Sequence, residues 1–352
     1  VTFADGADII TASAGTSNVR IGVNAGDAIA SGGNFNVVIG DEAGTALTTG
    51  DGVVAIGFEA LKTEDANGTT TAIGYQALKV QNAGAESNNT AVGYQAGVAT
   101  TTGVFSTFIG SLAGTANTTG QNTFVGGQAG QGNTDGTNNL GVGVNALQAN
   151  TTGDFSVAIG HFALQTQNLT DGSSGNNTAV GHNAGNDITT GTGNTILGAF
   201  AADAITTGDN NTALGFGCMN GLTTGSENTI IGSNMAMSAV GANGQFAIGY
   251  NATCTADNTF LIGDGANTVR IAIDGGTTSW TAASSDIRYK ENVETSTAGL
   301  SFVNDLRPVT YNWKKRKDVP KDTPRYKENS DEPVLGHEYG KTLHGFIAQE
   351  VK

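Results

Sequence analysis

A short unit recurs along most of this chain: an aliphatic residue, then a glycine, then an alanine three positions after the glycine. The residue before the glycine is always Ile, Val or Leu, and the residue three after it is Ala in thirteen of fifteen units, with Cys218 and Met235 in the other two. Successive units are separated by 14 to 21 residues, most often by 17. A period this short is typical of a solenoid and not of a globular enzyme domain. The fifteen glycines are Gly22, Gly40, Gly57, Gly74, Gly93, Gly110, Gly126, Gly143, Gly160, Gly181, Gly198, Gly215, Gly232, Gly249 and Gly263.

The residues between these glycines favour strands and tight corners over helix. Thr-Thr-Gly segments such as 101–103 and 206–208 separate the units, and Gly and Asn tolerate the positive φ that corners require. Gly, Thr and Asn at this density oppose helix. The sequence therefore predicts an all-β fold, a β-solenoid or β-roll with about seventeen residues a coil and strands of about five residues. Asn stands four before the glycine in nine units: Asn18, Asn36, Asn89, Asn122, Asn139, Asn177, Asn194, Asn211 and Asn228.

The repeated aliphatic residue and alanine lie four positions apart. In extended chain they share a face, so we expect both to fill a thin core, one layer for each coil. A single stack of this kind has a narrow core and two open ends. We therefore expect a homotrimer, which adds buried area and helps to protect the edges.

Charge divides sharply between the two parts of the chain. Residues 1–280 hold four basic and twenty acidic residues, whereas residues 281–352 hold twelve basic and eleven acidic ones. An acidic rod repels nucleic acid and anionic membranes, and no apolar run approaches the length of a membrane span. We expect no nucleic-acid partner and no membrane insertion. The four His and two Cys show no metal-ligand spacing, so neither a metal nor a cofactor is expected.

The repeat ends near Gly263, and the composition then becomes that of an ordinary globular segment. We assign residues 1–263 to the repeat rod, 264–284 to a terminal strand and linker, and 285–352 to a separate domain. Three blocks mark this last part: Ser285-Asp286-x-Arg288-x-Lys290-x-Asn292, Leu306-Arg307-Pro308-Val309-x-Tyr311-x-Trp313 and Gly345-Phe346-Ile347-Ala348-Gln349-Glu350.

In this order the three blocks resemble the intramolecular chaperone of phage tail spikes and fibres, the endosialidase-type domain classed as peptidase family S74. The resemblance implies a small α+β chaperone domain, of which residues 285–352 form the N-terminal part. The repeat region is separately similar to the β-roll heads of trimeric autotransporter adhesins, whose coils carry a similar Ala-Ile-Gly-x-x-Ala core.

The chaperone resemblance implies a self-cleaving dyad, Ser285 and Lys290, that cuts the bond between Ser284 and Ser285. A serine is a weak nucleophile until a base takes its proton, and a desolvated lysine with a lowered pKa can be that base. Asp286 and Arg288 are expected to hold the turn. Spacing alone leaves a second interpretation open, in which Ser285 caps a turn and Lys290 is solvated.

These features favour a structural virion protein: a phage tail-fibre rod for host attachment, assembled in the host cytoplasm, with a chaperone that directs trimer folding. Its expected partners are other tail or baseplate proteins and a host surface receptor, either a glycan or a protein. A polysaccharide-degrading tail spike, a bacterial surface adhesin and an ice-binding solenoid are the alternatives. A spike needs paired carboxylates beside aromatic platforms. Ice binding needs Thr-x-Thr ladders on flat strands, whereas the threonines noted above lie at corners.

Overall fold

The protein is described by a computed structural model that places residues 13–84, 86–273, 281–282, 309–311, 315–319, 321, 326–331 and 343–345. The chain divides into two compact units, Val1–Ser285 and Asp286–Lys352. The first unit contains the repeats, and each unit is described by itself below.

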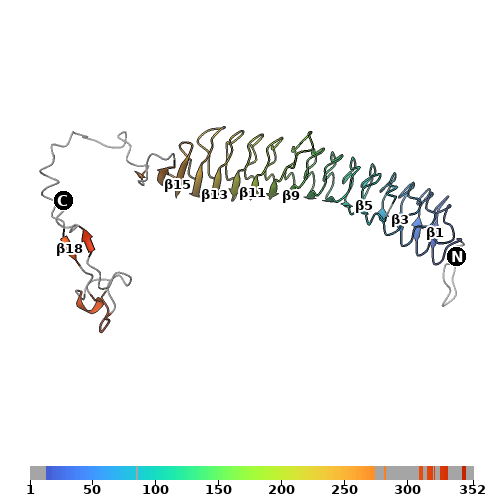
Figure 1. The fold of residues 1–352 in the computed structure, drawn as a ribbon, viewed down its shortest axis with the longest axis horizontal. Coiled ribbons are helices and arrows are strands. Elements are labelled where there is room, and N and C mark those ends of the chain that lie inside the picture. The colour runs from blue at the N-terminus through green and yellow to red at the C-terminus, as the bar shows by residue number, and fades with distance from the viewer. Residues whose placement is uncertain are drawn as a thin grey trace. The chain divides into compact units, whose positions relative to one another are not determined.

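In the first unit every repeat forms one coil with a short strand, and the strands stack in parallel (Figure 1). Pairing is in register with the repeat, so that Val54 pairs with Thr71 and Ile56 with Ile73. The predicted all-β solenoid of about seventeen-residue coils is therefore confirmed. The strands are β1 (Val19–Ile21), β2 (Val37–Ile39), β3 (Val54–Ile56), β4 (Thr71–Ile73), β5 (Thr90–Val92), β6 (Thr107–Ile109), β7 (Thr123–Val125), β8 (Leu140–Val142), β9 (Val157–Ile159), β10 (Thr178–Val180), β11 (Thr195–Leu197), β12 (Thr212–Leu214), β13 (Thr229–Ser233), β14 (Phe246–Tyr250) and β15 (Thr259–Asp264).

The C-terminal end of this sheet changes direction. After β15 the chain returns as β16 (Asn267–Ala272), which pairs antiparallel with β15, and β17 (Thr281–Ala282) pairs antiparallel with β16. Strand β16 therefore occupies the edge on which a further parallel coil would otherwise stack.

In β2 to β7 and β9 to β15 the side chain two before the repeat glycine points into the coil, and its two neighbours point away. Ala72 and Ala158 are fully buried in this inward position, whereas Leu197, directly before its glycine, is 47% exposed. The prediction that this aliphatic residue fills the core is therefore wrong. The strand alternation breaks at the glycine, as at Gly143 with φ 135°, and the alanine three residues later, here Ala146, turns inward.

In several coils the core keeps its volume by compensation between two positions. Phe108 fills the inward strand position of its coil, and the position four after a repeat glycine is then glycine. A Cβ added to Gly97 or Gly114 would lie 2.6 or 2.5 Å from atoms of the Phe108 ring. In coils such as that of Ala158 the strand position is small, and a buried leucine, here Leu164, takes up the space. Close packing of this kind leaves few voids in a narrow core.

The repeated asparagines form a buried ladder that joins successive coils. The backbone N–H of Asn194 donates to Oδ1 of Asn177 at 2.8 Å, and Nδ2 of Asn194 donates to the carbonyl oxygen of Gly208 at 2.9 Å. Oδ1 of Asn194 in turn accepts the N–H of Asn211 at 2.9 Å. These asparagines therefore satisfy backbone groups at the corner, and the positive φ falls on the residue before them, such as Asn210 at 56°.

The described part of the second unit contains one strand pair and one short turn of helix. Strand β18 (Val309–Tyr311) pairs antiparallel with β19 (Leu343–Gly345), and η2 (Arg316–Asp318) is a 3-10 turn. Lys315 and Lys317 each place Nζ against Oδ1 of Asp331, at 2.8 and 2.6 Å. These two hydrogen bonds lower the pKa of Asp331 to about 2. Two residues of the basic run 314–317 are therefore paired with an acidic residue fourteen or more positions away.

Candidate functional site

The predicted cleavage residues lie outside the described residues. This applies to Ser284 and Ser285, to the predicted base Lys290, and to the supporting residues Asp286 and Arg288. The dyad is therefore still a prediction from the sequence. The candidate sites that the structure does describe are surfaces of the solenoid.

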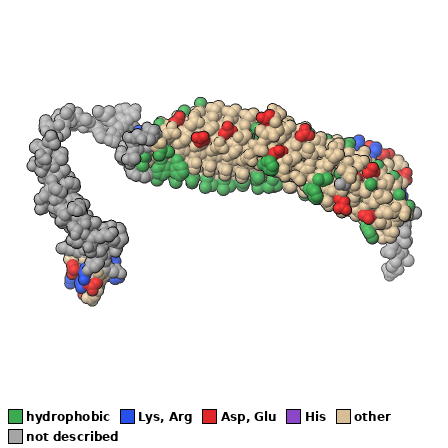
Figure 2. Space-filling model, in the orientation of Figure 1, with side chains coloured by type: hydrophobic (Ala, Val, Ile, Leu, Met, Phe, Trp, Pro, Cys, Tyr) green, Lys and Arg blue, Asp and Glu red, His purple; other side chains and the backbone are tan. Residues whose placement is uncertain are grey.

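The outward side chains of β1 to β15 form one long surface, here called the strand face. It consists of the residues three and one before each repeat glycine. The first of these is mostly Thr or Val, and the second is always Ile, Val or Leu. Seven of the fifteen aliphatic members are exposed, among them Leu197 by 47%, Ile262 by 43% and Leu214 by 40%, and the other eight are partly buried. In Figure 2, hydrophobic side chains gather in a band along the C-terminal half of the rod, on the side where Figure 1 draws the strand arrows.

No side chain of the strand face is charged, although residues 1–280 carry twenty acidic and four basic residues. The acidic residues instead lie on the corners and the remaining surface, where Asp51 and Asp171 are exposed. A long exposed surface that carries aliphatic side chains and no charge is a candidate interaction site. This surface is not expected from the sequence when the aliphatic column is assigned to the core. Aligned repeats carry the signal, since two columns of them hold no charged residue.

A ladder of polar side chains runs along coils one to five, two residues after each glycine. Nε2 of Gln76 donates to Oε2 of Glu59 at 2.8 Å, and Nε2 of Gln95 donates to Oε1 of Gln76 at 2.8 Å. Lys62 and Lys79 bind the Glu59 carboxylate at 2.8 and 2.6 Å. The carboxylate is nearly buried, so these donors replace the water that it has lost. The members of this polar ladder are Asn24, Glu42, Glu59, Gln76 and Gln95.

Three exposed aromatic rings lie beside the polar ladder, one on each of coils three to five. The ring centroids of Phe58 and Tyr75 are 5.3 Å apart, and those of Tyr75 and Tyr94 are 5.4 Å apart, all nearly parallel. This spacing is close to the strand spacing of about 4.8 Å, so each ring stacks on its equivalent in the next coil. A second stack, His161 on His182 at 5.3 Å, lies further along the rod. Both stacks hold neighbouring coils in register.

The carboxylate of Glu59 predicts an acid sensitivity of the rod. Hydrogen bonds from Lys62, Lys79 and Gln76 lower its pKa from 4.5 to about 2. A group whose pKa is lower in the folded chain stabilises the fold above its unfolded pKa, and this contribution is lost as the pH falls from 4.5 towards 2. We expect the thermal midpoint to fall over this interval, and to fall less in Glu59→Gln. Thermal melts followed by circular dichroism at each pH measure it, with Glu227→Gln, at an exposed position, as the control that keeps the wild-type response.

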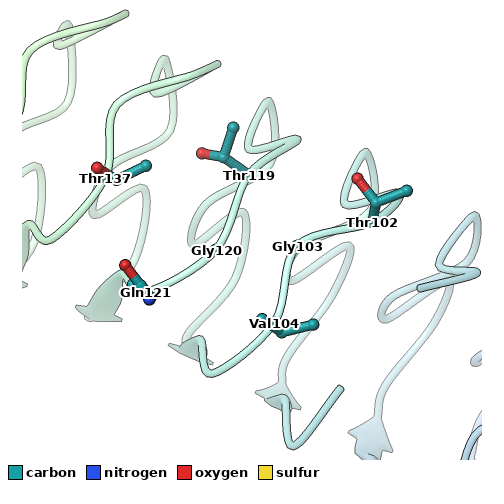
Figure 3. Close-up of a pocket in the computed structure, with 7 residues that line it drawn as sticks. All are labelled: Thr102, Gly103, Val104, Thr119, Gly120, Gln121 and Thr137. Atoms are coloured by element: carbon teal, nitrogen blue, oxygen red, sulfur yellow. The ribbon is translucent and has the colours of Figure 1, made fainter. Parts of the chain in front are cut away.

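The corners offer a shallow hollow but no reactive chemistry. Residues of three successive corners line it (Figure 3): Thr102, Gly103, Val104, Thr119, Gly120, Gln121 and Thr137. Its lining contains no acid, base or thiol. The thiols of Cys218 and Cys254 are buried in the core, where burial raises the pKa of each to about 11. Thiols of this kind are poor nucleophiles.

Within the described residues, no three His, Cys, Asp or Glu side chains are grouped so that they could hold a metal ion. No helix in the same part of the chain is long and apolar enough to cross a membrane.

Comparison with known proteins gives one result, and it concerns the second unit. No curated protein and no solved structure matches the chain. A family model does match residues 285–352, and its description is the chaperone of endosialidase, Peptidase_S74. The match begins at Ser285 and leaves the solenoid outside it. The chain therefore consists of a β-solenoid followed by a segment similar to the chaperone of endosialidase.

Proposed function

We propose that this protein is the rod of a bacteriophage tail fibre, a homotrimer whose C-terminal segment directs folding and then cleaves itself off. The observation that carries the proposal is the order of the two parts: a solenoid of fifteen stacked parallel strands, followed after about twenty residues by a segment that matches the chaperone of endosialidase. Other tail or baseplate proteins hold the rod in the virion. A host surface glycan or protein is its receptor.

The physics of the rod explains why a chaperone is useful. Parallel strands in successive coils pair residues about seventeen apart, and their unpaired edges are exposed to aggregation until the stack is complete. A segment that brings chains together raises their local concentration and sets a common register. After the segment is removed, an unfolded chain no longer has a template for refolding. The stability of the assembled rod is then kinetic.

Replacing Ser285 with alanine tests the maturation step. The wild-type protein is expected to yield two fragments joined originally at Ser284–Ser285. Lys290 takes the proton of the Ser285 hydroxyl, whose oxygen attacks the carbonyl carbon of residue 284; the peptide C–N bond breaks as the Ser285 nitrogen takes that proton, and a water molecule then hydrolyses the resulting ester to release a carboxylate at Ser284 and the free hydroxyl of Ser285. Without the nucleophile, cleavage is expected to slow by a factor on the order of 10³ or more. Intact-mass spectrometry of the full protein measures the fragments.

Ser284→Ala is the matched control, since it changes a neighbouring hydroxyl that takes no part in the attack. It is expected to be processed like the wild type. Fragments of wild-type size from Ser285→Ala contradict the proposed dyad. Antibodies against the rod then test whether the protein belongs to a phage particle. They are expected to label tail fibres on phage particles, whereas labelling of a bacterial envelope identifies an adhesin.

A further inference from the structure

We propose that the strand face of the solenoid is the surface through which copies of this chain associate, parallel and in register. The number of copies, three, comes from the proposed function, on which this inference rests. It assigns a particular surface of the described rod to the contact, with the threonine and aliphatic side chains of β1 to β15 packed against those of the neighbouring copy.

The size of the strand face suits a stable interface. Fifteen strands about 4.8 Å apart extend over roughly 65 Å, and three residues of about 3.3 Å each give a width of about 10 Å. The resulting area is about 700 Å², close to the roughly 800 Å² that each partner buries in a standard protein interface. Side chains such as Leu197 and Ile262 are 47% and 43% exposed in the single chain, so they project far enough to interdigitate with those of a second copy.

Charge favours a second copy as the occupant. The formal net charge of the chain is −15, so two copies repel wherever their acidic surfaces meet. The strand face is free of charged side chains, and its burial therefore costs no desolvation of ions. Copies of the same chain meet there with the least repulsion.

The repeat also fixes the orientation of one copy relative to the next. The strand face has the same two columns at every coil, with a spacing set by strand pairing. A partner that contacts its whole length needs the same spacing, which a second copy has by construction. Parallel alignment in register places each aliphatic layer beside its equivalent, and leaves both C-terminal segments at the same end.

Charge substitutions on the strand face test the surface. The wild-type protein is expected to have three times the mass of its own chain in light scattering, where the 352 residues before cleavage have a mass of 35.5 kDa. The double variant Leu197→Lys and Leu214→Lys is expected to fall to the mass of one chain, because two buried ammonium groups in each copy would face their equivalents. Val240→Lys is the matched control, since Val240 is 62% exposed and lies outside the strand face. It is expected to stay associated.

Single cysteine substitutions give a second measurement that does not depend on dissociation. Leu214 belongs to the twelfth of fifteen coils, so its equivalents in two copies meet only when the copies are parallel and in register. Copper-catalysed air oxidation, in which oxygen accepts the electrons of two thiols, is expected to cross-link Leu214→Cys and to leave Val240→Cys single. The native thiols are buried in the core and are expected to stay reduced.

The outcomes separate this inference from the proposed function. A wild-type trimer that survives the double lysine substitution, and that cross-links through Val240→Cys, overturns the strand face as the interface and leaves the fibre proposal intact. A folded wild-type protein with the mass of one chain overturns both. Thermal hysteresis by that single chain would assign the strand face to ice.

Discussion

Replacing Gly143 with alanine is expected to disrupt the stack between β8 and β9. Gly143 has φ 135°, a conformation that alanine rarely adopts, and an added Cβ would lie 2.4 Å from the carbonyl oxygen of Gly160 in the next coil. The obstacle is backbone, so no rotamer change can relieve it. Strained backbone of this kind costs on the order of 3 kcal/mol, and the contact adds to it. Since each coil packs only on its neighbours, the loss should be centred on the coils around β8 and β9.

Hydrogen exchange resolved along the chain measures this effect, together with denaturant unfolding followed by circular dichroism. Fast exchange is expected around residues 140–160, with slower exchange towards the ends of the rod. Gly172→Ala is the control, because Gly172 has φ 74° and an added Cβ meets nothing within 4 Å. It is expected to lose no more than about 1–2 kcal/mol. Equal losses from both variants would show that the stacked glycines have no special role.

Replacing Asn211 with alanine is expected to destabilise the rod by about 2–5 kcal/mol, because it leaves two buried backbone groups without partners. Nδ2 of Asn211 donates to the carbonyl oxygen of Gly225 at 3.0 Å, and Oδ1 accepts the N–H of Asn228 at 3.1 Å. Asn211 is 1% exposed, so water cannot replace the lost side chain without a cavity to hold it. The free energy of unfolding in denaturant measures the loss.

Two further variants locate the cause. Asn211→Asp keeps the shape and the acceptor but removes the donor, so it is expected to destabilise at least as much as alanine at neutral pH, where it buries a charge. Thr207→Ala changes an exposed position of the same coil and is expected to stay within about 0.5 kcal/mol of the wild type. A mild effect of Asn211→Ala would mean that ordered water forms hydrogen bonds with these two backbone groups in place of the side chain.

The coil could be predicted from the sequence because its most constrained positions allow few residues. Gly143 and its equivalents stack backbone on backbone, and Asn194 and its equivalents pair with backbone at the corners of nine coils. Both columns are therefore visible as fixed residue types at a fixed period. The period alone gives the solenoid and its coil length.

The direction of the side chains could not be predicted with the same rule. The prediction assumes that side chains keep alternating across the repeat glycine as they do in a regular strand. The positive φ of that glycine breaks the alternation, so the residues after it face the side opposite to the expected one. The true inward pair, such as Ala158 and Ala163, lies five positions apart. The strand position is also variable, since Phe108 and Ala158 occupy it in different coils, and its volume is compensated elsewhere. The strands are mostly three residues long and not five for the same reason, because corners begin at the glycine.

The modular contact between coils has a consequence for how such a protein changes over generations. One coil meets only the coil before it and the coil after it, and consecutive coils use the same backbone joints. Recombination between misaligned repeats that inserts or deletes one unit therefore changes the reach of the rod by about 4.8 Å and leaves every remaining joint intact. Gene-level unequal exchange can thus adjust length in small, tolerated steps.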